Sequence, residues 1–457
     1  MGKLIVASNR EPYDIEFRDN KLKLHKTVGG LVSALEPIIK SLGGVWVCWG
    51  RKGQRIPEVF KVSEKLTIKF VPLSEKSISN YYYGFSNKTL WPLCHMFLSR
   101  TKFEKAYWTS YRMVNGKFAN AILEMYETGD TVMVNDYHLS LVPSMLREKG
   151  FKDRIFFFWH IPFPSYCIYR FLPWGKEIIE GFLGADVIGF HTENYVESFL
   201  ECVRKLTDAK IKGNKILWNG REIKVRAIPI GIDAERWKRD ASSQGTIKHI
   251  KKMRKELNVE YIGLSVDRLD YTKGLKEKFL SIDRFFDKYP SFRGRMSFIQ
   301  IAVPSRTKIQ EYSDLKKEID QLISKINGAF GEPGWVPIYY YYKSFPSNKL
   351  AIFYRMADFA LITPIMDGLN LVAKEYVASQ VDSRGALILS KFAGASNQLK
   401  NGAIIINPFD TEKTADSIYK ALRMDPQEKK RRMEVMKREV MGKDLKWWAK
   451  EFFEGII

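Results

Sequence analysis

The stretch 357–380, ADFALITPIMDGLNLVAKEYVASQ, constrains the fold of this chain more than any other. Its apolar run Phe359–Ile362 predicts a buried strand, which Pro364 ends. The following Asp367-Gly368 predicts a tight turn, because glycine adopts backbone angles closed to other residues. From about Asn370 the apolar residues recur at helical spacing, so the sequence predicts a strand, a turn and a helix in succession.

A strand, a glycine turn and a helix start together leave backbone N–H groups where an anion can bind. Glu375 lies one turn beyond Leu371, on a face that can reach a ribose. An ordinary crossover connection of an α/β protein is the alternative interpretation of the same pattern.

A second stretch, SVDRLDYTKG at 265–274, follows the apolar strand expected at Tyr261–Val266. It places Arg268 and Lys273 on one loop, and these two cations suit a diphosphate, because arginine gives forked hydrogen bonds and lysine a point charge. The sequence contains no Asp-X-Asp, the carboxylate pair often used to hold a nucleotide-bridging metal. We therefore expect a nucleotide-sugar transferase that needs no metal or other cofactor.

Size and composition indicate a globular protein with more than one domain. The 457 residues are 45% hydrophobic and 14% aromatic, enough for two or more cores. The apolar run at the N-terminus is too short for a signal peptide, and no stretch approaches the roughly 20 apolar residues of a membrane span. The four cysteines are scattered without CxxC spacing, so we expect reduced thiols and a cytoplasmic protein.

The formal net charge of +22 raises the question of an anionic partner. Nucleic acid or an acidic membrane would fit, but a solvated basic surface around a site for phosphorylated substrates fits equally. The densest run, Lys429–Arg432, has Glu428 and Glu434 close by. Because no recognition motif or interleaved aromatics accompany the charges, we expect neither nucleic acid nor membrane as a partner.

Strand–helix alternation through residue 230 predicts a doubly wound α/β domain. Arg10, Asp136 and His160 follow three of its strands at their carboxyl ends, where ligands bind in open α/β sheets. Gly29-Gly30 would let backbone approach a ligand at the start of a helix expected over 31–42, although a simple turn is the alternative. The polar segment 11–27 is expected to be a loop or hairpin. The expected strands are 4–7, 45–49, 132–134, 155–159, 187–190 and 225–228.

A linker at 229–233 leads into a second alternating half. Its expected strands are 261–266, 297–302, 337–341, 359–362, 386–389 and 403–406, and its expected helices are 246–257, 307–326, 347–356 and most of the chain from 411. Near the C-terminus, Trp447, Trp448, Phe452 and Phe453 should pack onto a domain surface, with a membrane-surface helix as the alternative. The aromatic stretch 79–91 is expected to pack in a core. The sequence thus predicts two α/β domains with a cleft between them.

Seven motifs, in order from about residue 8 to residue 398, resemble the trehalose-6-phosphate synthase family of retaining glycosyltransferases. They are SNR, DYH, FFFWHIPFP, GFHTENY, DRLDYTKG, TPIMDGLNLVAKEY and FAGASNQL. The resemblance implies the GT-B fold, two Rossmann-like doubly wound domains facing a central cleft. Residues 1–232 would bind the acceptor, with a C-terminal helix 441–457 crossing back, and residues 233–440 would bind the nucleotide sugar.

The resemblance also implies residue roles. The donor-binding residues would be Gly30, Arg268, Lys273, Asp367, Asn370, Leu371 and Glu375. The acceptor-binding residues would be Arg10, Trp49, Tyr82, Trp91, Asp136 and Arg306. The residues at the reacting centre would be Arg268, Lys273, Asp136, His160 and Asp367.

The activity implied is transfer of glucose from a nucleotide-glucose to glucose 6-phosphate, giving α,α-trehalose 6-phosphate with retained configuration. The sequence departs from the family at Glu11–Tyr13 and Cys48, beside the expected acceptor site, so glycerol 3-phosphate is the alternative acceptor. A non-catalytic regulatory role is a further alternative, although such relatives typically lose the contacts retained here. The donor base stays open, a homo-oligomer is compatible with the sequence, and we expect a separate phosphatase to act on the product.

Overall fold

The computed structural model describes residues 2–18, 21–26, 35–36, 38–39, 43–51, 57–306 and 309–454. The chain forms two compact units. Unit 1 comprises Met1–Pro229 with Trp448–Ile457, and unit 2 comprises Ile230–Trp447. The sequence predicts these boundaries a few residues away, after residue 232 and at residue 441.

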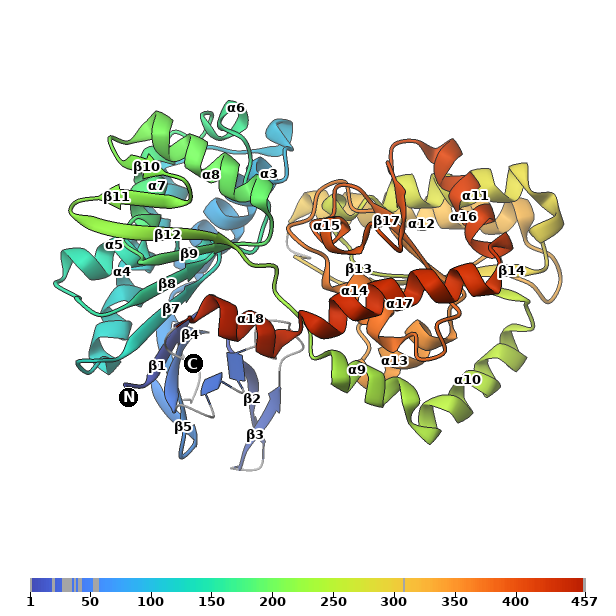
Figure 1. Ribbon diagram of the computed structural model, residues 1–457, viewed down its shortest axis with the longest axis horizontal. Coiled ribbons are helices and arrows are strands. Elements are labelled where there is room, and N and C mark those ends of the chain that lie inside the picture. The colour runs from blue at the N-terminus through green and yellow to red at the C-terminus, as the bar shows by residue number, and fades with distance from the viewer. Residues whose placement is uncertain are drawn as a thin grey trace. The chain divides into compact units, whose positions relative to one another are not determined.

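Unit 1 is built on one large sheet (Figure 1). Its strands are β1 (Leu4–Ala7), β4 (Gly44–Arg51), β5 (Val59–Ser63), β6 (Leu66–Leu73), β7 (Thr131–Asn135), β8 (Ile155–Phe158), β9 (Val187–Phe190), β10 (Lys210–Lys212), β11 (Lys215–Trp218) and β12 (Arg221–Ala227). The order across the sheet is β10-β11-β12-β9-β8-β7-β1-β4-β6-β5. From β6 to β12 neighbouring strands are parallel, and the chain reverses its winding direction between β1 and β7.

Helices and a hairpin complete unit 1. The segment expected as a loop or hairpin pairs β2 (Tyr13–Arg18) with β3 (Lys21–Lys26) in antiparallel register. Most of the helix expected over 31–42 lies outside the described residues. The helical segments are α2 (Glu75–Ile78), a π-helix (Ser79–Leu90), α3 (Trp91–Cys94), α4 (Lys105–Met125), α5 (Val142–Glu148), α6 (Tyr166–Tyr169), α7 (Gly175–Phe182) and α8 (Glu193–Leu206).

The C-terminal aromatic residues pack on the sheet of unit 1. Phe452 and Phe453 are fully buried and contact Phe156 of β8, with ring centroids 5.4 and 5.1 Å apart. Trp448 is equally buried against Phe158. The expectation of packing is therefore confirmed, and the alternative of a membrane-surface helix is wrong because this apolar face is already covered. Among the described residues, no helix is long and apolar enough to cross a membrane.

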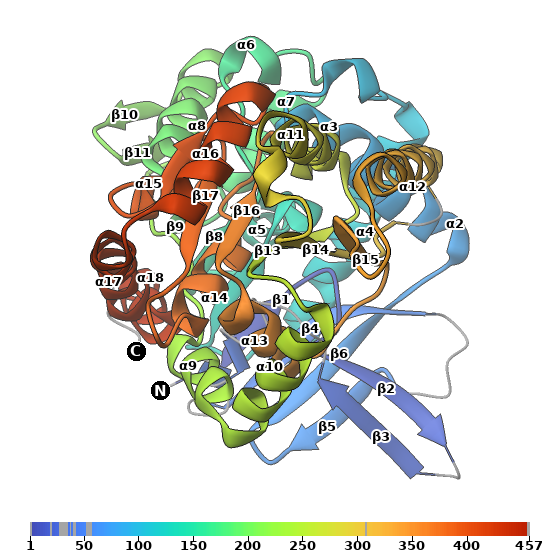
Figure 2. The same cartoon turned by 90° about the vertical axis from the view of Figure 1, so that its right-hand side faces the viewer.

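Unit 2 has a six-stranded parallel sheet (Figure 2). Its strands are β13 (Tyr261–Arg268), β14 (Met296–Val303), β15 (Ile338–Tyr341), β16 (Phe359–Ile362), β17 (Ala386–Ser390) and β18 (Ile404–Ile406). Their order, β15-β14-β13-β16-β17-β18, reads 3-2-1-4-5-6 along the chain, the order of a dinucleotide-binding fold. The winding direction reverses between β13 and β16, where such folds bind their ligands.

Helices cover both faces of this sheet. The helices of unit 2 are α9 (Ala234–Ser242), α10 (Gln244–Leu257), α11 (Leu275–Lys288), α12 (Gln310–Phe330), α13 (Ser347–Met356), α14 (Leu371–Ser379), α15 (Ser396–Leu399), α16 (Thr411–Arg423) and α17 (Pro426–Gly442). The last helix, α18 (Leu445–Phe452), begins in unit 2 and enters unit 1 at Trp448. In Figure 2, α11, α12 and α16 lie on one face of the sheet, and α13 and α14 lie on the other with α9.

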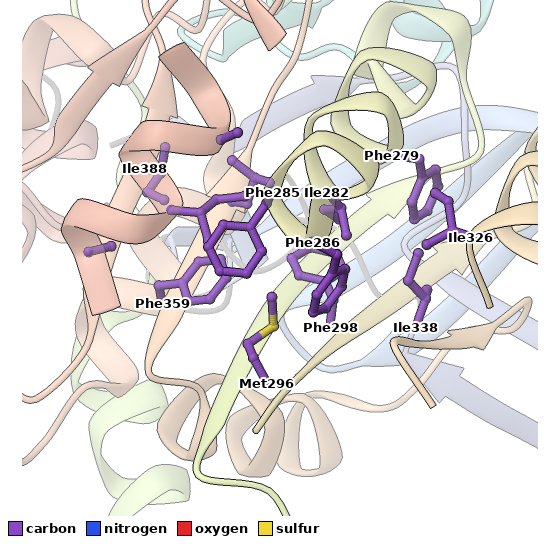
Figure 3. Packing of buried hydrophobic residues seen from close by; sticks show 14 of the residues in the cluster. Phe279, Ile282, Phe285, Phe286, Met296, Phe298, Ile326, Ile338, Phe359 and Ile388 are labelled. Atoms are coloured by element: carbon purple, nitrogen blue, oxygen red, sulfur yellow. The ribbon is translucent and has the colours of Figure 1, made fainter. Parts of the chain in front are cut away.

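The main core of unit 2 lies under α11 (Figure 3). Phe279, Ile282 and Phe286 recur at helical spacing and are fully buried, so one stripe of the helix faces the sheet. They pack against Met296 and Phe298, which alternate along β14 and so share one face. The expected strands of unit 2 are all present, and the doubly wound α/β class is confirmed in both units.

Candidate functional site

The candidate residues of unit 2 gather where its sheet reverses direction. Lys273 follows β13 and Asp367 follows β16, and Lys273 Nζ lies 2.5 Å from Asp367 Oδ2. Both side chains are largely buried, at 12% and 14% exposure. The pair joins two loops separated by more than ninety residues of sequence, as expected for the carboxyl ends of neighbouring strands.

Two glycines allow these loops to approach closely. Gly274 caps the N-terminus of α11 with a φ of +59°, and a Cβ there would lie 2.1 Å from the carbonyl oxygen of Thr363. A Cβ on Gly394 would lie 2.2 Å from the carbonyl oxygen of Gly368. Larger residues at these positions would push the loops after β13, β16 and β17 apart.

Asn370 connects the Asp367 turn to the helix that follows. It has a φ of 83°, and its side-chain oxygen accepts a hydrogen bond from the Ala373 N–H at 3.0 Å, capping α14. Its side-chain nitrogen donates to Asp367 Oδ2 at 3.0 Å. Leu371 is the first residue of α14, so its N–H belongs to the turn whose N–H groups have no partner within the helix.

Arg268 and Arg306 meet at a buried carboxylate that the sequence analysis missed. Asp270 is fully buried, with Arg306 Nη1 at 2.7 Å and Arg268 Nη2 at 3.9 Å. Burial alone would raise the pKa of Asp270, but the positive charges of Arg306, Arg268 and Lys273 outweigh it and hold that pKa at about 2. Asp270 also accepts from the Thr272 N–H at 3.1 Å, an Asx-turn that the Asp-Tyr-Thr order indicates.

Glu375 lies on α14 and accepts a hydrogen bond from the Tyr354 hydroxyl at 2.9 Å. Burial raises the pKa of this carboxyl group to about 7, against the opposing effect of the hydrogen bond. Near neutral pH the group is therefore balanced between its charged and neutral forms.

In unit 1 the corresponding reversal point carries aromatic side chains. Arg10 follows β1 and donates from Nη2 to the Tyr82 hydroxyl at 2.8 Å. The Tyr82 ring is stacked with both Trp49 and His138, and the ring centroids are 5.9 Å apart in each pair. The indole N–H of Trp49 is buried and has no hydrogen-bond partner within the described part of the chain. Trp46, by contrast, donates its N–H to Ser8 and is fully buried. Of the two tryptophans of β4, Trp46 therefore packs in the core and Trp49 lies against Tyr82.

Trp91 belongs to the same unit but contacts different rings. It lies 4.1 Å from the His95 ring and 6.0 Å from the Tyr137 ring, centroid to centroid. Tyr137 in turn lies 3.9 Å from His138. Tyr82, Trp91 and Trp49 are thus linked through a continuous set of rings.

Asp136 has a strained backbone at the end of β7. Its φ of 71° is unusual for a residue with a side chain, and such strain concentrates at functional sites. Its Oδ1 accepts from the N–H groups of Tyr137 at 3.0 Å and His160 at 3.2 Å. The carboxylate therefore joins the ends of β7 and β8.

His160 lies beside Asp136 at the end of β8. Its Nε2 is 3.4 Å from Asn135 Oδ1, a partner the sequence analysis did not single out. Burial lowers the pKa of His160 to about 3. The imidazole is therefore neutral near pH 7, where it can donate one hydrogen bond and accept another.

The structure thus divides the predicted residues into two groups. Arg306, which the resemblance placed with the acceptor, lies in unit 2 with Asp270, whereas Arg10, Tyr82 and Trp91 lie in unit 1. Gly30 lies outside the described residues. No group of three or more metal-ligating side chains occurs among the residues that the structure describes.

Comparison with known proteins supports the family resemblance. The sequence model of glycosyltransferase family 20 matches residues 2–456. The bifunctional trehalose-6-phosphate synthase/phosphatase of Thermoproteus tenax is 39% identical over 470 residues, and the match covers all of this chain and 63% of that protein. The chain therefore spans less than two thirds of that relative.

Two solved structures show the same fold. One, described as trehalose-6-phosphate from E. coli bound with UDP-2-fluoro glucose, has a TM-score of 0.92 and 33% identity, covering 100% of both chains. The other is an alpha,alpha-trehalose-phosphate synthase (UDP-forming) from Burkholderia xenovorans in complex with glucose-6-phosphate, with a TM-score of 0.90, 32% identity and 99% coverage of both chains. The predicted GT-B class is confirmed by this likeness, and the chain belongs to glycosyltransferase family 20.

Proposed function

We propose that this chain transfers glucose from UDP-glucose to glucose 6-phosphate and forms α,α-trehalose 6-phosphate with retention of configuration. The observation that carries the proposal is the Lys273–Asp367 pair beside Arg268 at the reversal point of unit 2. The relatives' names supply the substrates: one binds a UDP-glucose analogue, and another, called UDP-forming, binds glucose 6-phosphate.

Binding of the donor would separate Lys273 from Asp367 and give each of them a new partner on the ligand. In the structure Asp367 neutralises Lys273. A bound diphosphate would take the ammonium group of Lys273, and Asp367 would then accept hydrogen bonds from hydroxyls of the transferred sugar. Asn370 would hold Asp367 in place through its 3.0 Å hydrogen bond. Glu375 would accept hydrogen bonds from the ribose hydroxyls, and Leu371 would offer its backbone N–H.

The chemical step then depends on charge stabilisation. The bond between the sugar's anomeric carbon and the diphosphate oxygen breaks, and a bond to the acceptor hydroxyl oxygen forms on the same face. The acceptor proton passes to the departing phosphate oxygen. Arg268 and Lys273 stabilise the charge that grows on the leaving group, and preorganised cations are most effective in such a role. This step requires no enzyme carboxylate as a nucleophile and no metal.

The side chains gathered around Tyr82 and Asp136 in unit 1 suit a sugar phosphate. Arg10 supplies a positive charge, and the Tyr82 hydroxyl lies beside it at 2.8 Å. Trp49 offers a ring face together with an indole N–H that has no partner among the residues the structure describes, and Asp136 offers a carboxylate to sugar hydroxyls. His160 is neutral, so it would contact the transferred sugar through hydrogen bonds and would not act as an acid that transfers a proton.

Cellular context forms a further part of the proposal. All four cysteines are free thiols, which fits a reducing cytoplasm. The product's phosphate would be removed by a phosphatase activity, which a fused domain supplies in the Thermoproteus tenax relative by name. Self-association into a homo-oligomer is tested by light scattering, and phosphate release by the same protein sample tests where the phosphatase resides.

A product assay tests the function. Purified protein is given UDP-, ADP- or GDP-glucose with glucose 6-phosphate or glycerol 3-phosphate, and the product is identified by mass and by resistance to reducing-sugar reagents. A non-reducing disaccharide phosphate from UDP-glucose is expected, with and without a chelator. Product only with glycerol 3-phosphate would replace the acceptor, and nucleotide binding without any product would replace catalysis by a regulatory role.

A further inference from the structure

A fully buried ion pair, Asp267 with Lys278, flanks the loop 268–274 of unit 2 that carries the candidate diphosphate-binding residues. Asp267 is the penultimate residue of β13, and Lys278 lies in the first turn of α11. Their side chains are 1% and 0% exposed, and Lys278 Nζ donates to Asp267 Oδ2. The segment between them contains Arg268, Asp270 and Lys273.

Two further side chains complete this network. Lys278 Nζ also donates to Ser265 Oγ at 2.6 Å and to Gln300 Oε1 at 3.2 Å, so each of its three N–H bonds has an acceptor. Asp267 Oδ2 accepts in addition from Ser265 Oγ at 2.8 Å and Gln300 Nε2 at 3.2 Å. Ser265 and Gln300 are direct partners in the parallel register of β13 and β14.

The network interrupts an otherwise apolar face. Gln300 follows Met296 and Phe298 on the side of β14 covered by α11, and Ala302 continues it. Burying a charge pair in such a place costs free energy, and apolar replacements of similar size often leave stability unchanged or increase it. Stability is therefore a poor explanation for four polar side chains here.

A better explanation is that the network fixes the register of β13 against β14. Ser265 and Asp267 share one face of β13, so Arg268 is directed to the other. A slip of one residue would put Arg268 in place of the buried carboxylate. At the other end of the segment, the Lys278 N–H donates to the carbonyl of Gly274 at 3.0 Å, so anchoring Lys278 also anchors the first turn beside Lys273.

We propose that the Asp267–Lys278 pair, with Ser265 and Gln300, is a positioning device that fixes where Arg268 and Lys273 meet the donor diphosphate. This inference rests on the proposed function for its ligand. None of the four residues contacts the substrate in this proposal, because all four are buried and hydrogen-bonded within unit 2.

The test separates positioning from stability. The double variant Asp267→Leu/Lys278→Met removes both charges and leaves an apolar pair, which should fold with a melting temperature near that of the wild type. We expect its affinity for UDP, measured by calorimetry, to fall on the order of tenfold or more, because small displacements of binding groups are costly. Asp267→Asn/Lys278→Gln, which keeps hydrogen bonding without charge, serves if the apolar variant does not fold.

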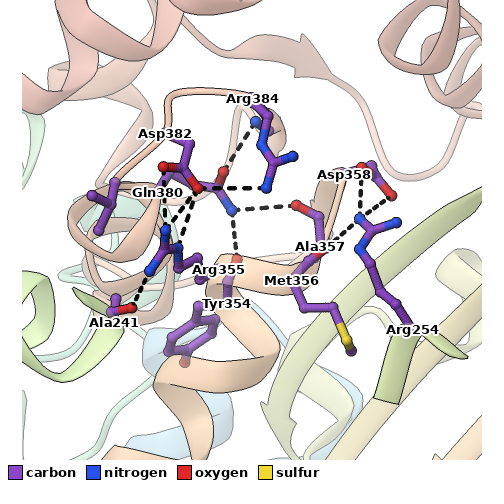
Figure 4. Close-up of polar contacts among 12 residues, drawn as sticks. Ala241, Arg254, Tyr354, Arg355, Met356, Ala357, Asp358, Gln380, Asp382 and Arg384 are labelled. Carbon is purple, nitrogen blue, oxygen red and sulfur yellow. Dashed lines mark hydrogen bonds and ion pairs between the residues drawn. The ribbon is translucent and has the colours of Figure 1, made fainter. Parts of the chain in front are cut away.

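The other end of the same strand supplies a matched control (Figure 4). Arg254 Nη2 lies 2.9 Å from each oxygen of Asp358, and Asp358 Oδ2 accepts the Ile262 N–H at 2.8 Å, at the start of β13. The variant Arg254→Met/Asp358→Asn should lower the melting temperature without changing UDP affinity. Equal loss of UDP affinity in this control would show general loosening and overturn the proposal, as would wild-type affinity in Asp267→Leu/Lys278→Met.

Amide hydrogen exchange distinguishes this inference from the proposed function. We expect the amides of residues 269–274 to exchange faster in Asp267→Leu/Lys278→Met than in the wild type, without any nucleotide present. A wild-type protein that binds no nucleotide would overturn the proposed function. Unchanged exchange in this segment would overturn the positioning role, whatever the wild type binds.

Discussion

The two units share the order of the parallel strands around the reversal point, β6-β4-β1-β7-β8-β9 in unit 1 and β15-β14-β13-β16-β17-β18 in unit 2. They place different chemistry at that point. In unit 2 the loops after β13 and β16 bring together charged side chains, Lys273 with Asp367 and two arginines with Asp270. In unit 1 the loops after β1 and β7 bring Arg10 to a stack of aromatic rings and Asp136 to His160. Strand order therefore determines where a ligand binds, and the side chains on the loops determine which ligand.

Removing the central cation of unit 2 should have the largest effect. We expect Lys273→Ala to lower turnover by roughly 10²- to 10³-fold, as loss of one preorganised charge-stabilising group does in other enzymes. The melting temperature should change little. Steady-state kinetics on UDP-glucose and glucose 6-phosphate measures the loss.

The control for this prediction is Lys276→Ala. This lysine lies three residues further along, is 53% exposed and pairs with Glu318 on the surface. It should keep wild-type turnover. Substantial activity in purified Lys273→Ala would remove the proposed role of Lys273.

A smaller effect on the kinetics is expected from substituting Tyr82 in the aromatic stack of unit 1. Tyr82→Phe keeps the ring stack on Trp49 and His138 but removes the hydroxyl beside Arg10. A hydrogen bond to a charged group contributes about 1.5–3 kcal/mol, so we expect KM for glucose 6-phosphate to rise on the order of tenfold or more while KM for UDP-glucose stays unchanged. Tyr83→Phe is the matched control, and a rise in the UDP-glucose KM instead would contradict the division between units.

Nucleotide binding should release a proton through Glu375. Its pKa of about 7 in the free protein means that half of the molecules carry a neutral carboxyl at that pH, whereas ribose hydroxyls donate best to the ionised form. UDP affinity should therefore increase as the pH rises through about 7. Calorimetry in buffers of different ionisation enthalpy measures the proton release, which should be smaller in Glu375→Gln than in the wild type.

The smallest expected effect is that of the Glu375 carboxyl group on the pH dependence of stability in the ligand-free protein. Its pKa in the folded protein is raised from 4.5 to about 7, so the folded state binds the proton more tightly than the unfolded state. Its contribution to stability is fully present below pH 4.5 and is lost as the pH rises to 7. Thermal melts at pH 4.5 and 8 should show that Glu375→Gln loses less stability over this range than the wild type, and equal losses would contradict the raised pKa.

Local patterns in the sequence predicted much of this architecture. The apolar runs that became β13, β16 and β17 stood out because strands buried on both faces read as continuous apolar segments. Strands β5, β6, β10 and β11 were not anticipated. The strands β5, β10 and β11 are short and mix polar with apolar residues, and Lys69 and Pro72 interrupt the apolar run of β6. Of the candidate site, the sequence motifs named most residues in advance, and their roles stay predictions; Asp270 and Asn135 were not singled out as partners.

The sequence by itself determined which chemistry is available: two cations on one loop, a carboxylate in a glycine turn, and polar residues after apolar strands. It did so because strand periodicity, turn residues and helix starts are local properties of the chain. Only the tertiary structure decided that Lys273 pairs with Asp367, that Arg306 joins Asp270, and that Lys278 is buried against Asp267. Those pairings depend on the order and register of strands far apart in the chain, and the charge state of Glu375 depends on the burial that packing creates.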